Sequence, residues 1–283
     1  MKLIRFGELN KEKPGVLIND IRYDVSAYCE DYNEVFFENG GLEKLRGILK
    51  NQKTLPEVPA GVRAGSPIAR PSKIVCIGLN YADHARETGA ALPPEPVIFL
   101  KSSTALTGPY DDIVIPKNSQ KTDWEVELAV VIGKKASYVE ESEALEYIAG
   151  YTLHNDVSER EFQIERNGTW DKGKGCDTFA PLGPFLATQD EIADIDNLRL
   201  WLTVNGQNMQ DGTTADFIFK IPFVVSYVSQ FMTLLPGDLI STGTPAGVGL
   251  GMKPPVYLKE GDVVELGIPG LGISKQRLVA YKK

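Results

Sequence analysis

Two glutamates, Glu125 and Glu127, stand at the start of an apolar run that continues from Leu128 to Ile132. The β-branched residues of this run favour a strand, and side chains alternate faces along a strand, so both carboxylates are expected to point the same way. Carboxylates held side by side repel each other unless a hard divalent cation such as Mg²⁺ neutralises them. The simpler interpretation is a solvated edge strand with an acidic outer face, and alternation alone favours that interpretation.

A third carboxylate, Asp156, follows a second β-type run over residues 150–155. Three carboxylates from two strand ends would suit an octahedral Mg²⁺ or Mn²⁺ that keeps positions open for water and substrate. We therefore predict a metal site at Glu125, Glu127 and Asp156. His154 lies beside them in the sequence, but we interpret it as a hydrogen-bonded core residue, which is the commoner role of such a histidine.

His84 and Glu87 are three residues apart in a segment that predicts a turn of helix. Positions i and i+3 share a helix face, so the carboxylate can reach the imidazole. A carboxylate on one ring nitrogen fixes the tautomer and leaves the other nitrogen as a general base. The spacing by itself favours a surface pair of small energetic value.

Cationic and amide side chains near these acids could hold a substrate carboxylate or stabilise an enolate. They are Lys101, Arg160, Gln163, Lys172 and Lys174. Lysines in a glycine-rich loop are otherwise ordinary solvated charges. Residues 242–249 form another glycine-rich loop, whose backbone N–H groups could approach an anion. That loop lacks the ending of a phosphate-binding P-loop and matches no dinucleotide motif, so we reject a nucleotide site.

The N-terminal part of the chain predicts a small α/β unit. Residues 2–25 contain short β-type runs joined by polar turns, which is typical of a β-meander. Residues 30–50 favour a helix that is interrupted at Gly40-Gly41. The candidate apolar positions of this helix are Val35, Leu42, Leu45 and Leu49.

Prolines and glycines crowd residues 53–72, which indicates a linker. We therefore predict a small N-terminal module over residues 1–70 and a larger domain over residues 71–283. The predicted strands of the larger domain are residues 73–78, 97–100, 124–132, 150–155, 198–204, 239–242, 263–268 and 273–281. Its predicted helices are residues 80–88, 142–148 and 223–231, the last being a buried helix. Many strands and few helices indicate a β-rich α+β fold.

Residues 158–180 are polar and contain few apolar positions. A long irregular segment of this kind in a folded domain is usually a lid, a binding loop or disorder. We predict that this segment is a lid that binding orders.

Composition excludes several classes of protein. The formal net charge of −8 argues against a nucleic-acid partner. The three cysteines, Cys29, Cys76 and Cys176, form no C-x-x-C pair, so neither a disulfide framework nor a zinc site is indicated and a cytoplasmic location fits best. The N-terminus has no apolar core of signal-peptide length, and no apolar run is long enough to span a bilayer.

Several segments, in order, resemble the fumarylacetoacetate hydrolase family. The matching pieces are Gly78-Leu79-Asn80-Tyr81-Ala82-Asp83-His84, Phe99-Leu100-Lys101, Asp123-Trp124-Glu125-Val126-Glu127-Leu128, Asn155-Asp156-Val157-Ser158-Glu159-Arg160, Lys174, Asp177-Thr178 and Thr242-Gly243-Thr244-Pro245. The resemblance runs from about residue 72 to the C-terminus, about three-quarters of the chain. It implies a mixed β-sandwich roll, the family's catalytic fold, which is usually paired into a homodimer.

The resemblance also implies roles for single residues. Glu125, Glu127 and Asp156 match the family's ligands for Mg²⁺ or Mn²⁺, and His84 and Glu87 match the His–Glu dyad of its acylpyruvase-like branch. Lys174 and Gln163 match substrate-side polar residues of the family, and Thr244 lies in its substrate loop. We expect Lys174 to act in catalysis and Lys101, Arg160, Gln163 and Thr244 to bind substrate. The N-terminal module and residues 170–177 look like the bacterial branch that acts on diketo sugar acids.

We therefore expect hydrolysis of the C3–C4 bond of a small anionic 2,4-diketo acid, such as 2,4-diketo-3-deoxy-rhamnonate or -fuconate. His84, oriented by Glu87, would take a proton from water, and Lys174 would stabilise the pyruvate enolate that leaves. The products would be pyruvate and a second acid such as lactate. Two alternatives stay open: decarboxylation of oxaloacetate or a related lyase or isomerase reaction, and a metal-binding protein without turnover.

Overall fold

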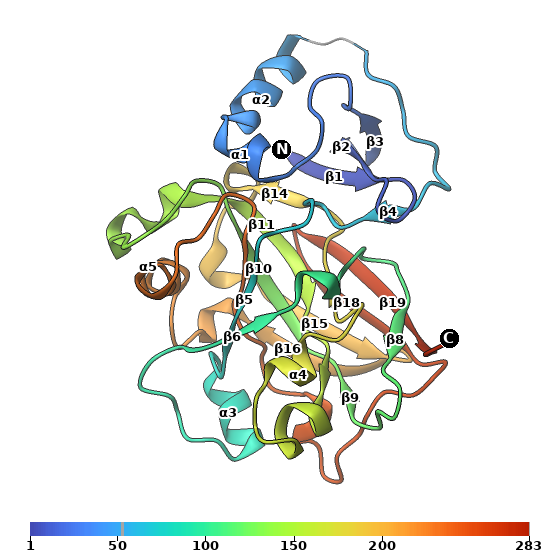
Figure 1. Ribbon diagram of the computed structural model, residues 1–283, viewed down its shortest axis with the longest axis vertical. Coiled ribbons are helices and arrows are strands. Elements are labelled where there is room, and N and C mark those ends of the chain that lie inside the picture. Colours follow the sequence, from blue (N-terminus) through green and yellow to red (C-terminus); the bar gives the residue numbers. More distant parts are fainter. Residues whose placement is uncertain (52–53, 283) are drawn as a thin grey trace.

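One large sheet dominates the computed structural model, which describes residues 1–51 and 54–282 (Figure 1). Its strands are β1 Lys2–Phe6, β2 Lys13–Ile18, β3 Ile21–Asp24, β4 Ala64–Gly65, β5 Ile74–Gly78, β6 Val97–Lys101, β10 Val126–Ile132, β11 Ile148–Asn155, β14 Leu186–Thr188 and β17 Leu239–Ser241. Their order across the sheet is β3-β2-β1-β14-β11-β10-β17-β5-β6, and β4 pairs with β1. The strands next to the predicted metal ligands, β10 and β11, therefore lie in its interior.

The predicted β-meander is present as β1, β2 and β3. Asn19 and Asp20 join β2 to β3 with φ angles of 49° and 64°, the left-handed conformation that tight hairpin turns require. β1 also pairs with β14, so the sheet continues from the N-terminal segment into the rest of the chain. Whether residues 1–70 fold as a separate module stays a prediction.

Two helices follow the meander, α1 Glu34–Glu38 and α2 Gly41–Asn51, and they are separated by Gly40 at a φ of 68°. The interruption at the glycine pair is thus confirmed. The choice of Val35 as an apolar core position is wrong, because its side chain is 61% exposed, whereas its neighbour Phe36 is buried. The helix is too short to establish a period, so the pattern alone could not assign its buried face.

A second sheet has the order β16-β15-β18-β19-β8. Its strands are β8 Ile113–Ile115, β15 Arg199–Val204, β16 Gln207–Thr213, β18 Val263–Ile268 and β19 Gly272–Ala280. Asn205 and Gly206 form the hairpin turn that joins β15 to β16, with φ angles of 51° and 79°. Because β15 and β18 pack against β10, the two sheets form a sandwich, as expected.

Two short ribbons complete the strands. They pair β9 Thr122–Asp123 with β12 Ser158–Glu159, and β7 Leu106–Thr107 with β13 Ala180–Pro181. In the first ribbon, β9 ends two residues before Glu125 and β12 begins two residues after Asp156, so their pairing holds both segments of the predicted metal site together.

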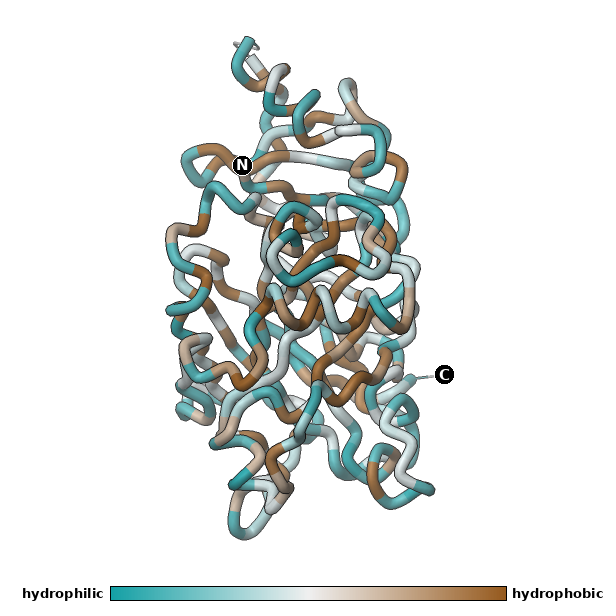
Figure 2. The backbone as a smooth tube through the Cα atoms, turned by 90° about the vertical axis from the view of Figure 1, so that its left-hand side faces the viewer, coloured by the Kyte–Doolittle hydropathy of each residue, from teal (hydrophilic) through white to brown (hydrophobic). Residues whose placement is uncertain are grey.

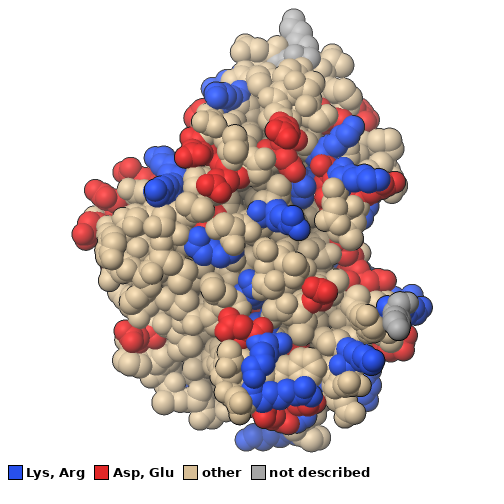
Figure 3. Space-filling view, viewed as in Figure 1, with Lys and Arg blue, Asp and Glu red and all other residues tan. Residues whose placement is uncertain are grey.

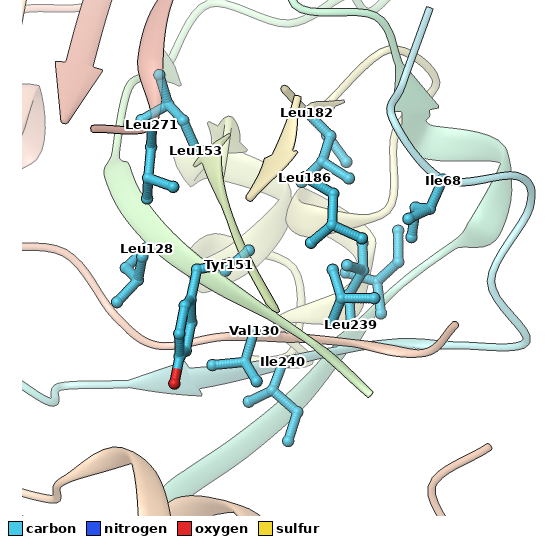
Figure 4. Close-up of a cluster of buried hydrophobic side chains, with 14 of the residues drawn as sticks. Ile68, Leu128, Val130, Tyr151, Leu153, Leu182, Leu186, Leu239, Ile240 and Leu271 are labelled. Atoms are coloured by element: carbon cyan, nitrogen blue, oxygen red, sulfur yellow. The ribbon is translucent and has the colours of Figure 1, made fainter. Parts of the chain in front are cut away.

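The hydrophobic core lies between the two sheets and around β10 (Figure 4). Leu128, Val130 and the other residues up to Ile132 are fully buried, so both faces of this strand lie in the core. Leu153 and Ile240 come from the strands on either side of β10 and complete the cluster. Figure 2 shows hydrophobic segments running through the middle of the molecule, with others along its outline.

The helices of the larger domain are short. They are α3 Ala82–Thr88, α4 Asp171–Lys174 and α5 Ile221–Phe231, with a π-helix Glu161–Glu165 and 3₁₀ helices Ser103–Ala105, Glu141–Tyr147, Gln189–Glu191, Ile195–Asn197, Thr214–Asp216 and Gly249–Gly251. The predicted buried helix after Pro222 is present as α5, with Val228 buried, although Phe231 at its end is 60% exposed. Among the helices of the described residues, none combines the length and the apolar character needed to cross a membrane.

Residues 158–180 are not irregular throughout, which corrects the prediction for this segment. They contain β12, the π-helix and α4, and they end in β13. Hydrogen bonds hold this segment in place where apolar contacts are few. The buried carboxylate of Glu159 accepts hydrogen bonds from Thr122 Oγ1 at 3.0 Å and from the Lys121 N–H at 3.1 Å. Whether the segment acts as a lid stays a prediction.

Candidate metal centre and catalytic pocket

The antiparallel register of β10 and β11 brings the three predicted metal ligands together. Val126 pairs with Asn155, so Glu125 and Asp156 are the next pair along, and the Asp156 N–H donates to the Glu125 carbonyl at 2.9 Å. Glu125 directly precedes β10, and Glu127 lies within it. The three carboxylates are buried, and each offers an oxygen within 4.8 Å of the others. The solvated edge strand is thereby excluded.

Glu127 is held from the side of β17. Its Oε2 accepts hydrogen bonds from the Gly243 N–H at 3.0 Å and from the Ser241 hydroxyl. The same hydroxyl lies 2.6 Å from Nδ1 of His154, so His154 is a hydrogen-bonded core residue as predicted. Its Nε2 is buried without a partner among the described residues, and burial lowers the pKa of His154 to about 3, which keeps the ring neutral.

Buried cations neutralise the other two carboxylates. Nζ of Lys174 lies 2.6 Å from Glu125 Oε2 and 2.9 Å from Asp156 Oδ2. Lys101 Nζ lies 2.5 Å from Asp156 Oδ1, and Arg160 lies 2.7 Å from Glu125 Oε1. Glu127 forms no ion pair with any described residue.

The pKa values follow from this arrangement. Burial raises the pKa of Glu127 well above its ordinary value, and the charges of Asp156 and Glu125 raise it further. Burial also acts to raise the pKa of Glu125, but Lys174 and Arg160 outweigh it and the pKa is lowered. For Asp156, Lys101 and Lys174 likewise overcome burial and lower the pKa. Burial acts to lower the pKa of Lys174, but the neighbouring carboxylates raise it on balance.

The donor set fits a divalent cation. All three groups are carboxylates, which hard cations prefer, and their oxygens are close enough to share one ion. Glu127 is a deeply buried acid that no side-chain cation contacts, and such a group is costly to ionise without a positive charge nearby. The acidic triad is therefore consistent with a site for a divalent metal.

The predicted dyad forms on α3. Nδ1 of His84 lies 2.9 Å from Glu87 Oε1, and Glu87 Oε2 accepts a hydrogen bond from the Gly247 N–H at 2.9 Å. Nε2 of His84 has no hydrogen-bond partner among the described residues, and His84 lines a pocket with the carboxylates. Asn80 holds the start of α3, since its side chain bonds the Phe219 N–H at 2.7 Å and the Thr242 carbonyl at 2.8 Å.

The loop that follows β17 binds carboxylates of the protein itself. Its backbone N–H groups donate to Glu127, Glu87 and Asp123. These amides do approach anions, as expected, but the anions are carboxylates of the protein itself. Thr244 belongs to the same loop, and its hydroxyl donates to the Val126 carbonyl at 2.9 Å, which occupies its only proton.

A pocket of about 180 Å³ brings most of the predicted site residues together. Its lining residues are Ile77, Gly78, Leu79, His84, Thr88, Ala90, Phe99, Glu125, Glu127, Arg160, Gln163, Ile164, Trp170, Lys174, Thr244 and Leu250. Lys101 does not line it, because its ammonium is buried against Asp156. Lys172 lies outside as well, where its exposed ammonium donates to the Arg166 carbonyl at 2.5 Å.

A larger hollow of about 670 Å³ lies elsewhere, beside the N-terminal segment. Arg5 and Arg63 line it, but each is paired with an acid, Asp31 and Asp111 respectively. Arg70 also lines this hollow and forms no ion pair with a described residue, but the hollow contains neither the carboxylate triad nor the histidine–glutamate pair.

Sequence reasoning missed two residues that position the site. Asp123 accepts hydrogen bonds from Arg160 Nε at 2.8 Å and from the Gly249 N–H at 2.7 Å, so it joins residues 158–180 to the loop after β17. Asp123, Glu125 and Glu127 occupy alternate positions in the sequence, and this spacing could have identified Asp123 as a site residue. Gln210 comes from the second sheet and accepts from the Val126 N–H at 2.9 Å, and nothing in the sequence pointed to it.

A β-rich roll with a buried carboxylate triad and a histidine–glutamate pair defines the class of protein. Residues 73–279 match the family described as "Fumarylacetoacetate (FAA) hydrolase C-terminal". The chain belongs to the fumarylacetoacetate hydrolase family. This confirms the family and the fold that the sequence motifs indicated.

Relatives cover nearly the whole chain. A Burkholderia multivorans protein, provisionally named a hydrolase, is 53% identical over 274 residues, which is 96% of each chain. The structure of fumarylacetoacetate hydrolase from Exiguobacterium antarcticum is 34% identical, with a TM-score of 0.85 over 99% of this chain and 100% of that one. Maleylpyruvate hydrolase from Sphingobium sp. SYK-6, solved with manganese(II) and pyruvate, is 28% identical, with a TM-score of 0.82 over 100% of both chains.

Proposed function

We propose that this protein hydrolyses the C3–C4 bond of a 2,4-diketo acid of the acylpyruvate type and releases pyruvate. The observation that carries this proposal is the meeting of the His84–Glu87 pair and the carboxylate triad in one pocket. A related hydrolase that was solved with manganese(II) and pyruvate supports it.

Glu125, Glu127 and Asp156 would hold Mg²⁺ or Mn²⁺, which would supply a Lewis acid that withdraws electron density from the bond that breaks. The charges of the site support an anionic substrate. The buried ionic cluster contains the acids Asp123, Glu125, Glu127 and Asp156 and the bases Lys101, Arg160 and Lys174. With all of them ionised and a divalent cation added, one positive charge is in excess, and one substrate carboxylate would neutralise it.

His84 is the proposed general base. Glu87 accepts the proton of Nδ1, which leaves the lone pair of Nε2 for the proton of an attacking water. The water oxygen adds to C4, the C3–C4 bond breaks, and its electron pair moves to C3. Pyruvate forms when C3 takes up a proton, and the acyl group leaves as the second acid.

Lys174 is the proposed partner of the negative charge that develops on the leaving enolate, since its ammonium reaches the pocket from between Glu125 and Asp156. Arg160 and Gln163 are proposed substrate-binding residues. The Gln163 amide accepts from Arg160 at 3.0 Å, so its NH₂ group stays available to a substrate oxygen. Lys101 and Thr244 would support them indirectly, by holding Asp156 and the backbone of Val126.

The finer substrate proposal is a diketo sugar acid such as 2,4-diketo-3-deoxy-rhamnonate or -fuconate. Its cleavage would yield pyruvate and lactate. The N-terminal module and the segment around α4 support this proposal through their resemblance to the bacterial branch that handles such acids.

Decarboxylation of oxaloacetate is the main alternative, because it passes through the same enolate and needs no water. The observation that favours hydrolysis is the His84–Glu87 pair, which has no evident task in decarboxylation or in a protein that only binds metal. A related isomerase reaction would use the pair but would release no pyruvate.

The test is an assay of the purified protein with Mg²⁺ or Mn²⁺ on acetylpyruvate, on the diketo sugar acid and on oxaloacetate. Hydrolysis predicts one pyruvate and one second acid per diketo acid consumed, and loss of both after treatment with a chelator. Carbon dioxide from oxaloacetate without cleavage of any diketo acid would establish the decarboxylase instead. A melting temperature that responds to metal, with no turnover of any of the three, would indicate a binding protein.

We also propose a homodimer. Phe219, Phe223, Tyr227 and Phe231 form a continuous row of ring contacts along α5, and Phe231 is largely exposed. Exposed aromatic surface of this extent supports an interface with a second copy. Light scattering coupled to gel filtration would give the mass, and a monomer at micromolar concentration would contradict this proposal.

A further inference from the structure

Trp170 is one of the few apolar anchors of residues 161–178. In this stretch, the apolar side chains that pack against the hydrophobic core are those of Trp170 and Cys176. The outer side of α4 is polar, because Lys172 is exposed, and Figure 3 shows Lys and Arg side chains interspersed with acids at the lower end of the molecule. The position of α4 therefore depends on contacts made at its inner side.

The indole of Trp170 lies in a notch at Gly78, the last residue of β5. A Cβ on Gly78 would stand 2.6 Å from Cζ3 of the indole and 3.1 Å from Cη2, so the ring fits this closely only against a glycine. The same ring packs edge-on against Phe99 of β6, with 5.2 Å between the ring centroids. All three residues line the catalytic pocket.

The backbone of Trp170 leads directly into the turn that carries Lys174. The Trp170 carbonyl accepts hydrogen bonds from the Gly173 N–H at 2.9 Å and from the Lys174 N–H at 3.1 Å. Asp171 adds a second connection, since its Oδ1 accepts from the Leu100 N–H of β6 at 3.0 Å. A helix as short as α4 has little stability of its own, so these contacts with β5 and β6 determine where it lies.

The position of the Lys174 ammonium leaves little tolerance. Nζ is buried at 2.6 Å from Glu125 Oε2 and 2.9 Å from Asp156 Oδ2. It also lies 5.0 Å from the centroid of the Phe99 ring, the ring on which Trp170 packs. A shift of α4 by about 1 Å would remove these contacts, and a misplacement of that size can cost about 100-fold in rate.

We propose that Trp170 is a positioning residue: its indole, seated in the notch at Gly78, fixes α4 so that Lys174 reaches the carboxylate triad. Trp170 takes no part in the chemistry itself. The kinetic consequences of this role rest on the proposed function, in which Lys174 stabilises the enolate, whereas its effect on α4 does not.

Gly78→Ala tests the seat while keeping the indole. The φ angle of Gly78 is not positive, so the backbone of β5 accepts an alanine, and the new methyl group meets the indole. We expect kcat for an acylpyruvate to fall by roughly tenfold or more, because Lys174 is displaced. Gly267→Ala is the matched control, since its Cβ would stand 2.7 Å from the ring of Trp201 in the second sheet, outside the pocket. It should leave kcat within about twofold. Equal losses of kcat in the two variants would overturn the proposal.

Two double-variant cycles show whether Trp170 acts through Lys174. Trp170→Leu should lower kcat by roughly tenfold to 100-fold. Leucine does not fill the notch, so adding Gly78→Ala should cost no more than about a further twofold. In a Lys174→Met background, Trp170→Leu should likewise cost no more than about twofold. Losses that multiply in either cycle would overturn the proposal and would indicate a direct contact of Trp170 with substrate or an effect on stability alone.

Hydrogen exchange separates this proposal from the proposed function, because it needs no substrate. The amides of Gly173 and Lys174 donate to the Trp170 carbonyl, so their exchange should become faster by roughly tenfold or more in Gly78→Ala but not in Gly267→Ala. If no diketo acid is cleaved, hydrolysis fails as the function, and faster exchange still supports the seat. Unchanged exchange of these amides in Gly78→Ala would overturn the proposal whatever the activity.

Discussion

The imidazole Nδ1 of His84 lies 2.9 Å from Oε1 of Glu87, and the second oxygen of that carboxylate is fixed by the Gly247 N–H. Glu87, itself held by Gly247, thus fixes the Nδ1 side of the ring. The remaining nitrogen, Nε2, has no partner among the described residues. This relationship separates hydrolysis from simpler enolate chemistry, because only hydrolysis needs a base for water.

His84→Ala deletes the proposed base and touches none of the three proposed metal ligands. A positioned general base typically contributes on the order of 10²–10⁴-fold, so hydrolysis of an acylpyruvate should fall by that order. Binding of Mg²⁺ by calorimetry should not change, and any decarboxylation of oxaloacetate should fall much less. Equal losses on both substrates in steady-state kinetics would assign His84 to binding or structure.

Glu87→Gln should have the same effect in milder form. The imidazole remains, but a neutral amide supports its orientation and basicity less well than a carboxylate. We expect a smaller loss of kcat than in His84→Ala and a changed pH dependence of the remaining activity. Unchanged kcat and pH profile would show that the pair is only a helix contact.

Glu127→Ala removes one of three carboxylates that offer oxygens within 4.8 Å of one another. We expect loss of activity and binding of Mg²⁺ or Mn²⁺ that is weaker by roughly tenfold or more in calorimetry. Glu260→Ala is the matched control, because Glu260 is exposed and far from the pocket lining. Metal binding like that of the unaltered protein would refute the ligand assignment.

Residues 158–180 carry Gln163 and Lys174 to the pocket on a π-helix and on α4, with few apolar anchors. We expect amide hydrogen exchange in this segment to slow when oxalate and Mg²⁺ are added together, because ligand contacts would add to the polar bonds that hold it. The buried strand β10 serves as an internal reference. Unchanged exchange at saturating ligand would refute the lid.

Asp111→Asn should lower the free energy of unfolding by about 1–3 kcal/mol near neutral pH. Burial acts to raise the pKa of Asp111, but hydrogen bonds from Arg63, Thr107 and Gly108 outweigh it, and the pKa is lowered in the folded state. The stabilisation is therefore complete above the pKa of the unfolded carboxyl, about 4, and disappears as the pH falls through the lower folded value.

Urea unfolding of Asp111→Asn at a series of pH values checks this prediction. The difference from the unaltered protein should shrink as the pH drops below about 4. Asp112→Asn is the control, because Asp112 is exposed and forms none of these bonds. A difference that stays constant with pH would assign the effect to packing and not to charge.

The sequence predicted the parts of the site that local patterns encode. The alternation of Glu125 and Glu127, the i, i+3 spacing of His84 and Glu87, and the apolar run after Glu127 are all found as expected. These features depend on the period of a strand or a helix, which neighbouring residues determine by themselves. The exposure of Val35 shows where this reasoning ends, because a helix of five residues has no period to measure.

Tertiary structure decided which charges meet. Lys101 and Lys174 both qualified as substrate-binding cations by type, but only Lys174 lines the pocket, while Lys101 is buried against Asp156. Gln210 supports β10 from a strand of the other sheet, 84 residues away in the sequence. The sequence by itself determined the carboxylates, the dyad and the strands that carry them. Their supporting contacts come from segments far apart in the chain, and such contacts depend on how the two sheets pack, which no local period encodes.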